Sequence, residues 1–414
     1  MMNRRSSAAM AYPAADHCPA TAFIRSLLSR CREGQNDPDL VIMNDAAEAT
    51  AALAHMEGFL PKELSCAHLI AAQRSLPDVT FRYAAVFKDG KPLLFACFQV
   101  FTLSSRSFNL HRNSSVVKHI LSLILNMRKA RVVVTGNALR TDLPCFCFDR
   151  SLISNKEALE TVAAIADRIA DRDDASAIIL TGTGDISVTT MRKLASWGYS
   201  TPLDDNTMEM NIPASWLNLQ DYIAALSRKY KTRANKILAA AEPITIRPIA
   251  EVEIDIYQDD INRLFAGVID KQPFVFTTSG GNYITELKRL YKDNFEIMGL
   301  FNGDQLIAFY SAFITPAEYE LFYVGFDIEL NATYQLYFNM LFSGLDRAIS
   351  LRKNVLKLGR TSFDAKASLG AKPVRKDYLI RLHHIPDAAS RWLVSYFSSL
   401  EDGGWKLRNP LKEQ

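Results

Sequence analysis

Two cations in a glycine-bounded turn are the residues whose types and spacing most clearly predict chemistry. Arg360 and Lys366 lie in the segment VLKLGRTSFDAKASLGAKP, residues 355–373. A short apolar run ends at Gly359, directly before Arg360, so we expect both cations at the end of a strand, where α/β proteins place binding sites. A helix N-terminus with an arginine beside it holds a phosphate or a carboxylate. The turn is therefore predicted to bind an anionic group.

Two other residues of this turn have a structural interpretation. Thr361 and Asp364 have the Thr-x-x-acid spacing of a helix capping box, and the short helix should end at Gly370. Capping accounts for both side chains without any function. Thr361 is also a candidate donor-binding residue, together with Gly359, because the two flank Arg360.

Residues 219–240 have the apolar period of an amphipathic helix, and they carry a basic face. Lys229, Arg233 and Lys236 recur at helical spacing, and residues 228–236 contain five cations and no acid. A solvated helix between domains accounts for this pattern. The alternative is a contact with an anion: a phosphorylated donor, a carrier protein or a lipid headgroup of a peripherally bound membrane.

Aromatic residues in two further segments are candidates for a substrate pocket. Phe274 and Phe276 precede a glycine pair, so this loop is either a lid over an apolar substrate or a buried anchor. Tyr334 and Tyr337 are three residues apart in a predicted helix over 331–348. They are interpreted as core or acyl-pocket residues.

The elements that must position these residues form two similar sets. Residues 81–104 and 295–314 are each a pair of β-rich runs, joined at Gly90 and at Gly303. Later apolar runs end at Gly136 in the first set and at Gly359 in the second. The pattern predicts one α/β unit with a mixed sheet, used twice.

Length supports the same division, because 414 residues exceed what one core usually holds. The predicted parts are a tail with a lead-in helix, a first domain, a basic linking helix, a second domain that carries the chemistry, and a C-terminal helix with a tail. Their ranges are 1–50, 51–217, 218–241, 242–389 and 390–414.

Composition excludes several classes of protein. The 48 basic and 45 acidic residues leave a net charge of +3, which argues against a chain that coats nucleic acid. No run approaches the ~20 apolar residues of a membrane-spanning helix, so a cytoplasmic location is the expectation. The six cysteines contain no CxxC pair and no histidines at ligand spacing, and the sequence predicts neither a metal site nor a disulfide framework.

The combination of these segments resembles the FemAB-like acyltransferases of the GNAT superfamily. The residues that carry the resemblance are the GRT…K…GA string at 359–371, the helix NATYQLYFNMLFSGLDRAI, the strand LFYVGFD and the basic helix LSRKYKTRANKI. The resemblance covers about residues 80–382. It implies two tandem GNAT folds that transfer an acyl or aminoacyl group from an activated carrier to an amine or hydroxyl, with no tightly bound cofactor.

One departure from the family bears on the donor. GNAT acetyltransferases bind the coenzyme A pyrophosphate with a glycine-rich turn, and here that place holds FDIELNATYQLY, which has no glycine. Glycine lets the backbone approach a pyrophosphate closely. Acyl-CoA and the pantetheine of an acyl carrier protein are both expected co-substrates, and the departure favours the carrier protein or an aminoacyl-tRNA.

The resemblance also assigns roles on the strand over residues 320–326. In GNAT folds the splayed central strand serves the chemistry, and Tyr323 is then the proton donor or positioner, while Asp327 is the base or amine anchor. With Arg360 and Lys366 they make up the expected catalytic set. The structural alternatives are that Tyr323 packs in the core and that Asp327 caps the next helix.

The sequence therefore predicts an N-acyltransferase acting on a small-molecule or peptide amine. An aminoacyl-tRNA-dependent peptidyl transferase and a non-catalytic lipid- or peptide-binding protein of the same fold are the alternatives.

Overall fold

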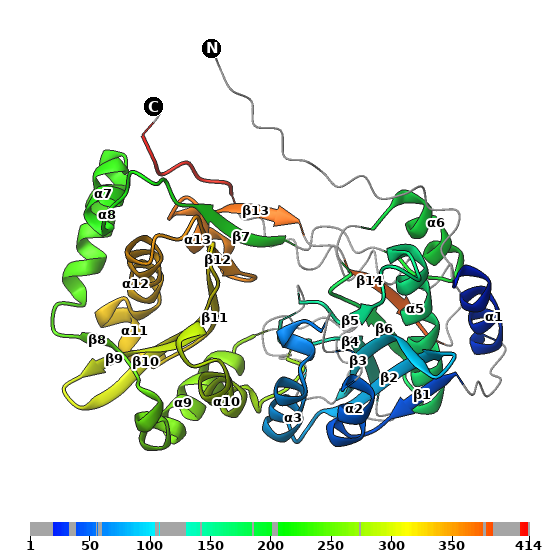
Figure 1. Cartoon of the computed structure of the whole chain (residues 1–414). Helices are drawn as coiled ribbons and strands as arrows, with labels where there is room; N and C mark the ends of the chain where they lie inside the picture. Colours follow the sequence, from blue (N-terminus) through cyan, green and yellow to red (C-terminus); the bar gives the residue numbers. More distant parts are fainter. Residues whose placement is uncertain are drawn as a thin grey trace, which may run out of the picture.

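Two mixed β-sheets form the framework of the protein (Figure 1). In the computed structural model the described residues are 20–32, 39–54, 56, 60–103, 107, 130–140, 143–183, 186–200, 206–272, 275–375, 378–383 and 406–412. The first sheet has the spatial order β1 (Leu40–Met43), β2 (Thr80–Lys88), β3 (Lys91–Leu103), β4 (Ala130–Thr135), β6 (Ala177–Leu180) and β14 (Leu379–Leu382), with β5 (Phe146–Phe148) also paired to β3. The second has the order β13 (Lys372–Arg375), β7 (Asn206–Asn211), β12 (Val355–Gly359), β11 (Glu318–Phe326), β10 (Gln305–Ile314), β9 (Phe295–Asn302) and β8 (Thr245–Pro248). The predicted α/β class with two mixed sheets is confirmed.

Both predicted hairpins are present. Lys88 pairs with Lys91 across the turn at Gly90, and Asn302 pairs with Gln305 across the turn at Gly303. Both glycines have positive φ, at 73° and 60°, which a residue without a Cβ adopts without strain.

The two sheets exchange their late strands. Strand β7 lies within the predicted range 51–217 but pairs with β12 and β13 of the second sheet. Conversely, β14 lies within 242–389 and pairs with β6 of the first sheet. Each sheet is thus completed by the other half of the chain. The domain boundaries remain a prediction. Each sheet contains a strand from the other predicted domain, β7 in the second sheet and β14 in the first.

Helices cover both sheets in layers. The outer face of the first sheet carries α1 (Thr21–Arg32), α5 (Asn155–Arg172) and α6 (Val188–Ser196). Between the sheets lie α2 (Ala46–Leu53), η1 (Lys62–Leu64), α3 (Cys66–Ser75), α9 (Ile254–Ile269) and α10 (Gly280–Tyr291), with η4 (Glu251–Glu253) and η5 (Lys292–Asn294) beside the last two. The outer face of the second sheet carries α7 (Leu219–Ala225), α8 (Arg228–Ala240) and α12 (Leu336–Ser350), next to α11 (Ile328–Tyr334) and α13 (Phe363–Ala367). The core between the sheets is continuous across both halves.

Two long helices predicted from periodicity are each interrupted, so those predictions are wrong in length. The predicted helix over 219–240 breaks at Leu226 and Ser227, where the C-terminal segment 406–412 pairs with it. The N–H of Ser227 donates to the Pro410 carbonyl at 2.9 Å. The predicted helix over 331–348 breaks at Gln335, which is left-handed with φ 50°. The predicted C-terminal aromatic helix lies outside the described residues.

A buried network of side chains joins the two halves. His68 of α3 contacts the Tyr283 hydroxyl through Nε2 at 3.2 Å and the Tyr291 hydroxyl through Nδ1 at 2.9 Å, both from α10. Asn137 donates to the Tyr283 hydroxyl at 2.8 Å. That hydroxyl therefore has its own proton free for Nε2, which leaves the His68 proton on Nδ1. The imidazole is neutral and fully bonded.

None of the helices the structure describes has both the length and the apolar character to cross a bilayer.

This network predicts acid sensitivity. Burial, with the nearby Arg140 guanidinium, lowers the pKa of His68 from 6.5 to about 4. The unfolded chain therefore binds more protons between these two values, and the unfolding free energy should fall by roughly 3 kcal/mol as the pH drops through this window. We expect urea unfolding to show that loss in the native chain and a smaller one in His68→Gln. Parallel pH profiles for the two proteins would contradict the assignment.

Candidate functional site

The second sheet opens between β11 and β12. The two strands pair in parallel only from Glu318 with Val355 to Glu320 with Lys357. Beyond this point β11 continues to Phe326 without pairing to β12. Main-chain N–H and C=O groups along this edge of β11 are therefore available to a substrate.

The corresponding place in the first sheet is closed. Strands β4 and β6 pair in parallel up to Val134 with Ile179. Just beyond, the Thr135 hydroxyl accepts from the Thr181 N–H at 2.7 Å, and the Thr181 hydroxyl donates to the Thr135 carbonyl at 2.6 Å. A Cβ at Gly182 would overlap the Leu143 carbonyl oxygen, so the segment around Leu143 fills the remaining space.

Register identifies what replaces that closure in the second sheet. Counted from the last parallel pair, Leu321 and Gly359 take the positions of Thr135 and Thr181. The atom nearest to a Cβ built on Gly359 is the Leu321 carbonyl oxygen, 4.0 Å away. The match expected between the runs ending at Gly136 and Gly359 is therefore wrong, since β4 corresponds to β11. The second sheet is therefore open at the position where hydrogen bonds between Thr135 and Thr181 close the first sheet.

Tyr323 lies on the unpaired part of β11. Its ring packs edge-on against Phe265 at 5.4 Å and Phe322 at 4.6 Å. Its hydroxyl makes no hydrogen bond with any residue the structure describes, and it is not among the fully buried unsatisfied atoms. Burial raises the pKa of Tyr323 to about 12, an effect that the Arg360 charge partly offsets. The phenol is thus protonated at neutral pH and able to donate.

Ser311 fixes the backbone of Tyr323, and the sequence analysis did not identify it. It sits at a bulge in β10, where the register with β11 shifts between Tyr310 and Ala312. Its hydroxyl donates to the Tyr323 carbonyl and accepts from the Tyr323 N–H, both at 3.1 Å. The side chain thereby replaces the ladder bonds that the bulge removes. A lone serine in the apolar run FYSAFI was the available signal.

The turn after β12 is held in an unusual conformation. Gly359, Thr361 and Ser362 all have positive φ, at 69°, 64° and 50°. Two of these are not glycine, and such strain is concentrated at functional sites. Lys366 stabilises the turn, because its ammonium or amine donates to the carbonyls of Gly359, at 3.2 Å, and Arg360.

The Lys366 amine therefore lies against the main chain of the turn that the sequence predicts to bind an anion. Only 4% of the residue is exposed, and burial lowers its pKa from 10.5 to about 7. A neutral amine has two N–H groups, which matches its two carbonyl partners. Arg360 is half-buried above it, while Thr361 is exposed.

The predicted capping box is wrong. The start of α13 has no side-chain cap, because its first residue is preceded by Ser362 in the left-handed region. Asp364 instead accepts from Arg408 of the C-terminal segment at 2.8 Å. Its carboxylate is exposed, and this Arg408 hydrogen bond lowers its pKa.

Asp327 adopts the capping role that was its structural alternative. Its Oδ1 accepts from the N–H groups of Glu329 at 3.0 Å and Leu330 at 3.1 Å, at the start of α11. The second carboxylate oxygen has no partner among the described residues. Asp327 follows the last residue of β11, so this oxygen is at the end of the open strand.

The two tyrosines of the predicted pocket differ in position. Tyr337 is in the first turn of α12, and burial raises the pKa of its phenol, an effect that Ser362 of the strained turn partly offsets. Its ring lies 6.0 Å from Phe326 at the end of β11. Tyr334 instead faces the β9–β10 hairpin, with Asn302 at 3.5 Å from its hydroxyl. Only Tyr337 is brought to the opening.

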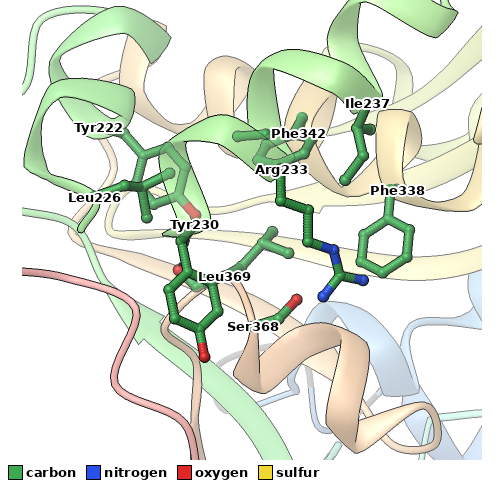
Figure 2. A pocket seen from close by; sticks show the side chains of 10 residues that line it. Tyr222, Leu226, Tyr230, Arg233, Ile237, Phe338, Phe342, Ser368 and Leu369 are labelled. Carbon is green, nitrogen blue, oxygen red and sulfur yellow. Dashed lines mark hydrogen bonds between the residues drawn. The ribbon is translucent and has the colours of Figure 1, made fainter. Parts of the chain in front are cut away.

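The basic face of α8 continues from this opening. The Arg233 guanidinium lies over the Phe338 ring at 4.8 Å, and Phe338 packs on Tyr337 at 6.1 Å. Figure 2 shows Arg233 pointing across the pocket toward Phe338 and Ser368. Lys229 and Lys236 are exposed and form no ion pair with any described carboxylate. The basic face of α8 is thus connected to the opening through the rings of Phe338 and Tyr337.

Of the two aromatic residues of the predicted lid, Phe276 is among the described residues. Phe276 packs on Phe101 of β3 with centroids 4.7 Å apart, and the neighbouring Thr277 donates to Asp78 at 2.7 Å. These contacts are those of a loop anchored on the first sheet. Phe274 lies outside the described residues.

Lys366 predicts how stability depends on alkaline pH. The pKa of this lysine is lower in the folded chain than in the unfolded chain, so the unfolded chain binds more protons between pH 7 and 10.5. The unfolding free energy should therefore rise with pH across this range, by a few kcal/mol at most. Lys366→Met should remove the rise, and Lys372→Met, at an exposed lysine, should retain it. A rise that survives in Lys366→Met would refute this account.

Comparison with known proteins gives structural likenesses only. No family model and no curated protein matches the chain. Among solved structures, FemX is similar at 10% identity and a TM-score of 0.44, covering 86% of this chain and 100% of FemX. A tandem GNAT protein from the clavulanic acid biosynthesis pathway has 10% identity and a TM-score of 0.45, covering 84% and 99%. A GCN5-related N-acetyltransferase from Kribbella flavida has 10% identity and a TM-score of 0.43, covering 84% and 72%. These values are too low to carry an activity over to this chain.

Proposed function

We propose that the protein is an acyltransferase that moves an acyl group from an activated, anionic carrier to an amine-bearing acceptor at the β11–β12 opening. The observation that supports this most is the Tyr323 hydroxyl, protonated and without a partner among the described residues, on the strand edge that the first sheet keeps closed. A transfer site needs a proton donor beside free main-chain donors, and both are present there.

We assign the steps of acyl transfer to the following groups. The acceptor amine attacks the carbonyl carbon of the thioester or ester, and a carbon–nitrogen bond forms. The tetrahedral oxyanion accepts hydrogen bonds from the free N–H groups of β11. The carbonyl–carrier bond then breaks, and the leaving sulfur or oxygen takes the Tyr323 proton. Beforehand, Asp327 Oδ2 anchors the incoming ammonium, which loses one proton to water and becomes the attacking amine. The second proton, lost after the carbon–nitrogen bond forms, passes through water and restores the Tyr323 phenol.

The donor is best accounted for as a large anionic carrier. The place where a pyrophosphate would meet α12 is filled by α11, and the Tyr337 N–H is already donated to Asn331 Oδ1 at 2.9 Å. Coenzyme A therefore lacks its usual backbone cradle. Lys229, Arg233 and Lys236 instead present an exposed charge that suits the acidic surface of an acyl carrier protein, with its pantetheine arm entering along Phe338 and Tyr337. Arg360 would receive the phosphate of that arm.

Replacing the proton donor tests the chemistry. Tyr323→Phe removes one hydroxyl from a packed ring, so the fold should persist while the transfer rate falls ~10²- to 10⁴-fold. We would measure thiol release from acetyl- and octanoyl-loaded acyl carrier protein with a panel of amines. Tyr257→Phe, on α9, is the matched control and should retain full activity. If no loaded carrier is consumed by the native chain, a binding protein becomes the better account.

Charge reversal on α8 tests the docking surface. Lys229→Glu with Lys236→Glu should raise KM for the loaded carrier protein at least 10-fold with little change in kcat, because both charges act before the chemical step. Lys271→Glu, an exposed lysine at the end of α9, is the control. Added salt should raise KM for the loaded carrier protein in the native chain and leave it nearly unchanged in the double variant. If the double variant and the native chain have equal KM values, α8 does not contact the donor. If the double variant instead loses only the consumption of aminoacyl-tRNA, the donor is an aminoacyl-tRNA and not a carrier protein.

A further inference from the structure

A second pocket lies in the first half of the chain, away from the β11–β12 opening. It lies between η1, α3, β3 and the segment that follows β4, and it spans about 360 Å³, a volume that includes the solvent at its mouth. Its polar lining consists of Glu63, His68, Gln99 and Asn137. The proposed transfer uses none of these residues.

Gln99 is an unusual residue for its place. Along β3, Cys97, Gln99 and Phe101 share the face that packs into the core between the sheets. Only 2% of Gln99 is exposed. Its Oε1 accepts from the Ala138 N–H at 2.9 Å, while Nε2 has no hydrogen bond to any residue the structure describes. This nitrogen is not among the fully buried atoms without a partner, so its N–H groups reach the pocket that Gln99 lines.

Among the described residues that line the pocket, Glu63 is the one with a charged side chain. Glu63, half-exposed on η1, has neither an ion pair nor a hydrogen bond from its carboxylate to a described residue. His68 is neutral, and both of its ring nitrogens are used by Tyr283 and Tyr291. Burial raises the pKa of the Cys97 thiol, so this group stays uncharged. The nearby Arg140 is paired with Glu320.

We propose that this pocket binds the N-terminal end of a peptide. The ammonium group pairs with Glu63, and the first carbonyl oxygen accepts from Gln99 Nε2. A free amino acid fits less well, because the pocket offers no cation to its carboxylate. Tyr283 and Phe322, with ring centroids 6.4 Å apart, stand between Asn137 and Tyr323. The site is therefore separate from the opening, and it stands whether or not acyl transfer occurs there.

Calorimetric titration of the full chain with glycinamide tests the proposal, because this probe has the ammonium and the carbonyl without a carboxylate. We expect saturable binding, at least 10-fold weaker for N-acetylglycinamide, which lacks the ammonium, and for ethylamine, which lacks the carbonyl. Glycine should also bind more weakly. No heat from glycinamide, or equal affinity for the acetylated probe, would overturn the proposal.

Variants locate the binding. Glu63→Gln changes an accessible side chain, so it should fold normally and weaken glycinamide at least 10-fold. Glu242→Gln, at an exposed glutamate on the other half, should bind like the native chain. Gln99→Glu keeps the acceptor for Ala138 but removes the N–H donor, and it should also lose affinity. Unchanged binding in Glu63→Gln would refute the site even where the Gln99 variant fails to fold.

Discussion

The ion pair between Arg140 and Glu320 is the constraint on which the candidate site depends. Glu320 is the last residue of β11 that pairs with β12, and beyond it the strand stays paired with β10 alone. Arg140, from the other half of the chain, bonds both oxygens of this carboxylate and stacks over the Phe313 ring at 3.7 Å. Both side chains are about nine-tenths buried. Removing one partner of such a pair costs ~3–5 kcal/mol, because the other charge is left buried.

This pair explains why an opening in one sheet requires both halves of the chain. An unpaired strand end would close onto its neighbour, as β4 and β6 do through Thr135 and Thr181. In the second sheet Arg140 holds β11 from the far side, and the Ser311 bulge holds it from within the sheet. The exchanged strands β7 and β14 then tie the halves together, so neither sheet is complete alone.

Much of the fold could be predicted because it depends on local pattern. The hairpins at Gly90 and Gly303 need only a few adjacent residues, whereas Tyr323 was singled out by the family resemblance of its strand. What failed depends on distant segments. Nothing near Leu226 disfavours a helix, and the break arises where residues 406–412 pair with it. The capping box at Thr361 and Asp364 failed for a similar reason, since Arg408 takes the acid. Pairings over such separations leave no local signal.

The two halves finally show what a duplicated unit gains by diverging. The first sheet closes its opening but keeps a polar side chain, Gln99, at a core position, with Nε2 unbonded to any described residue. The second sheet buries Glu296 of β9 in a pair with Arg347 and carries Tyr323 at its opening. Strands that separate lose main-chain hydrogen bonds, which costs stability. The closed first sheet supplies a fixed base from which Arg140 can pair with Glu320 of β11. Arg140 acts on β11 from the closed half and Ser311 acts from within the open sheet, so the two copies of the unit have diverged into a support and a candidate site.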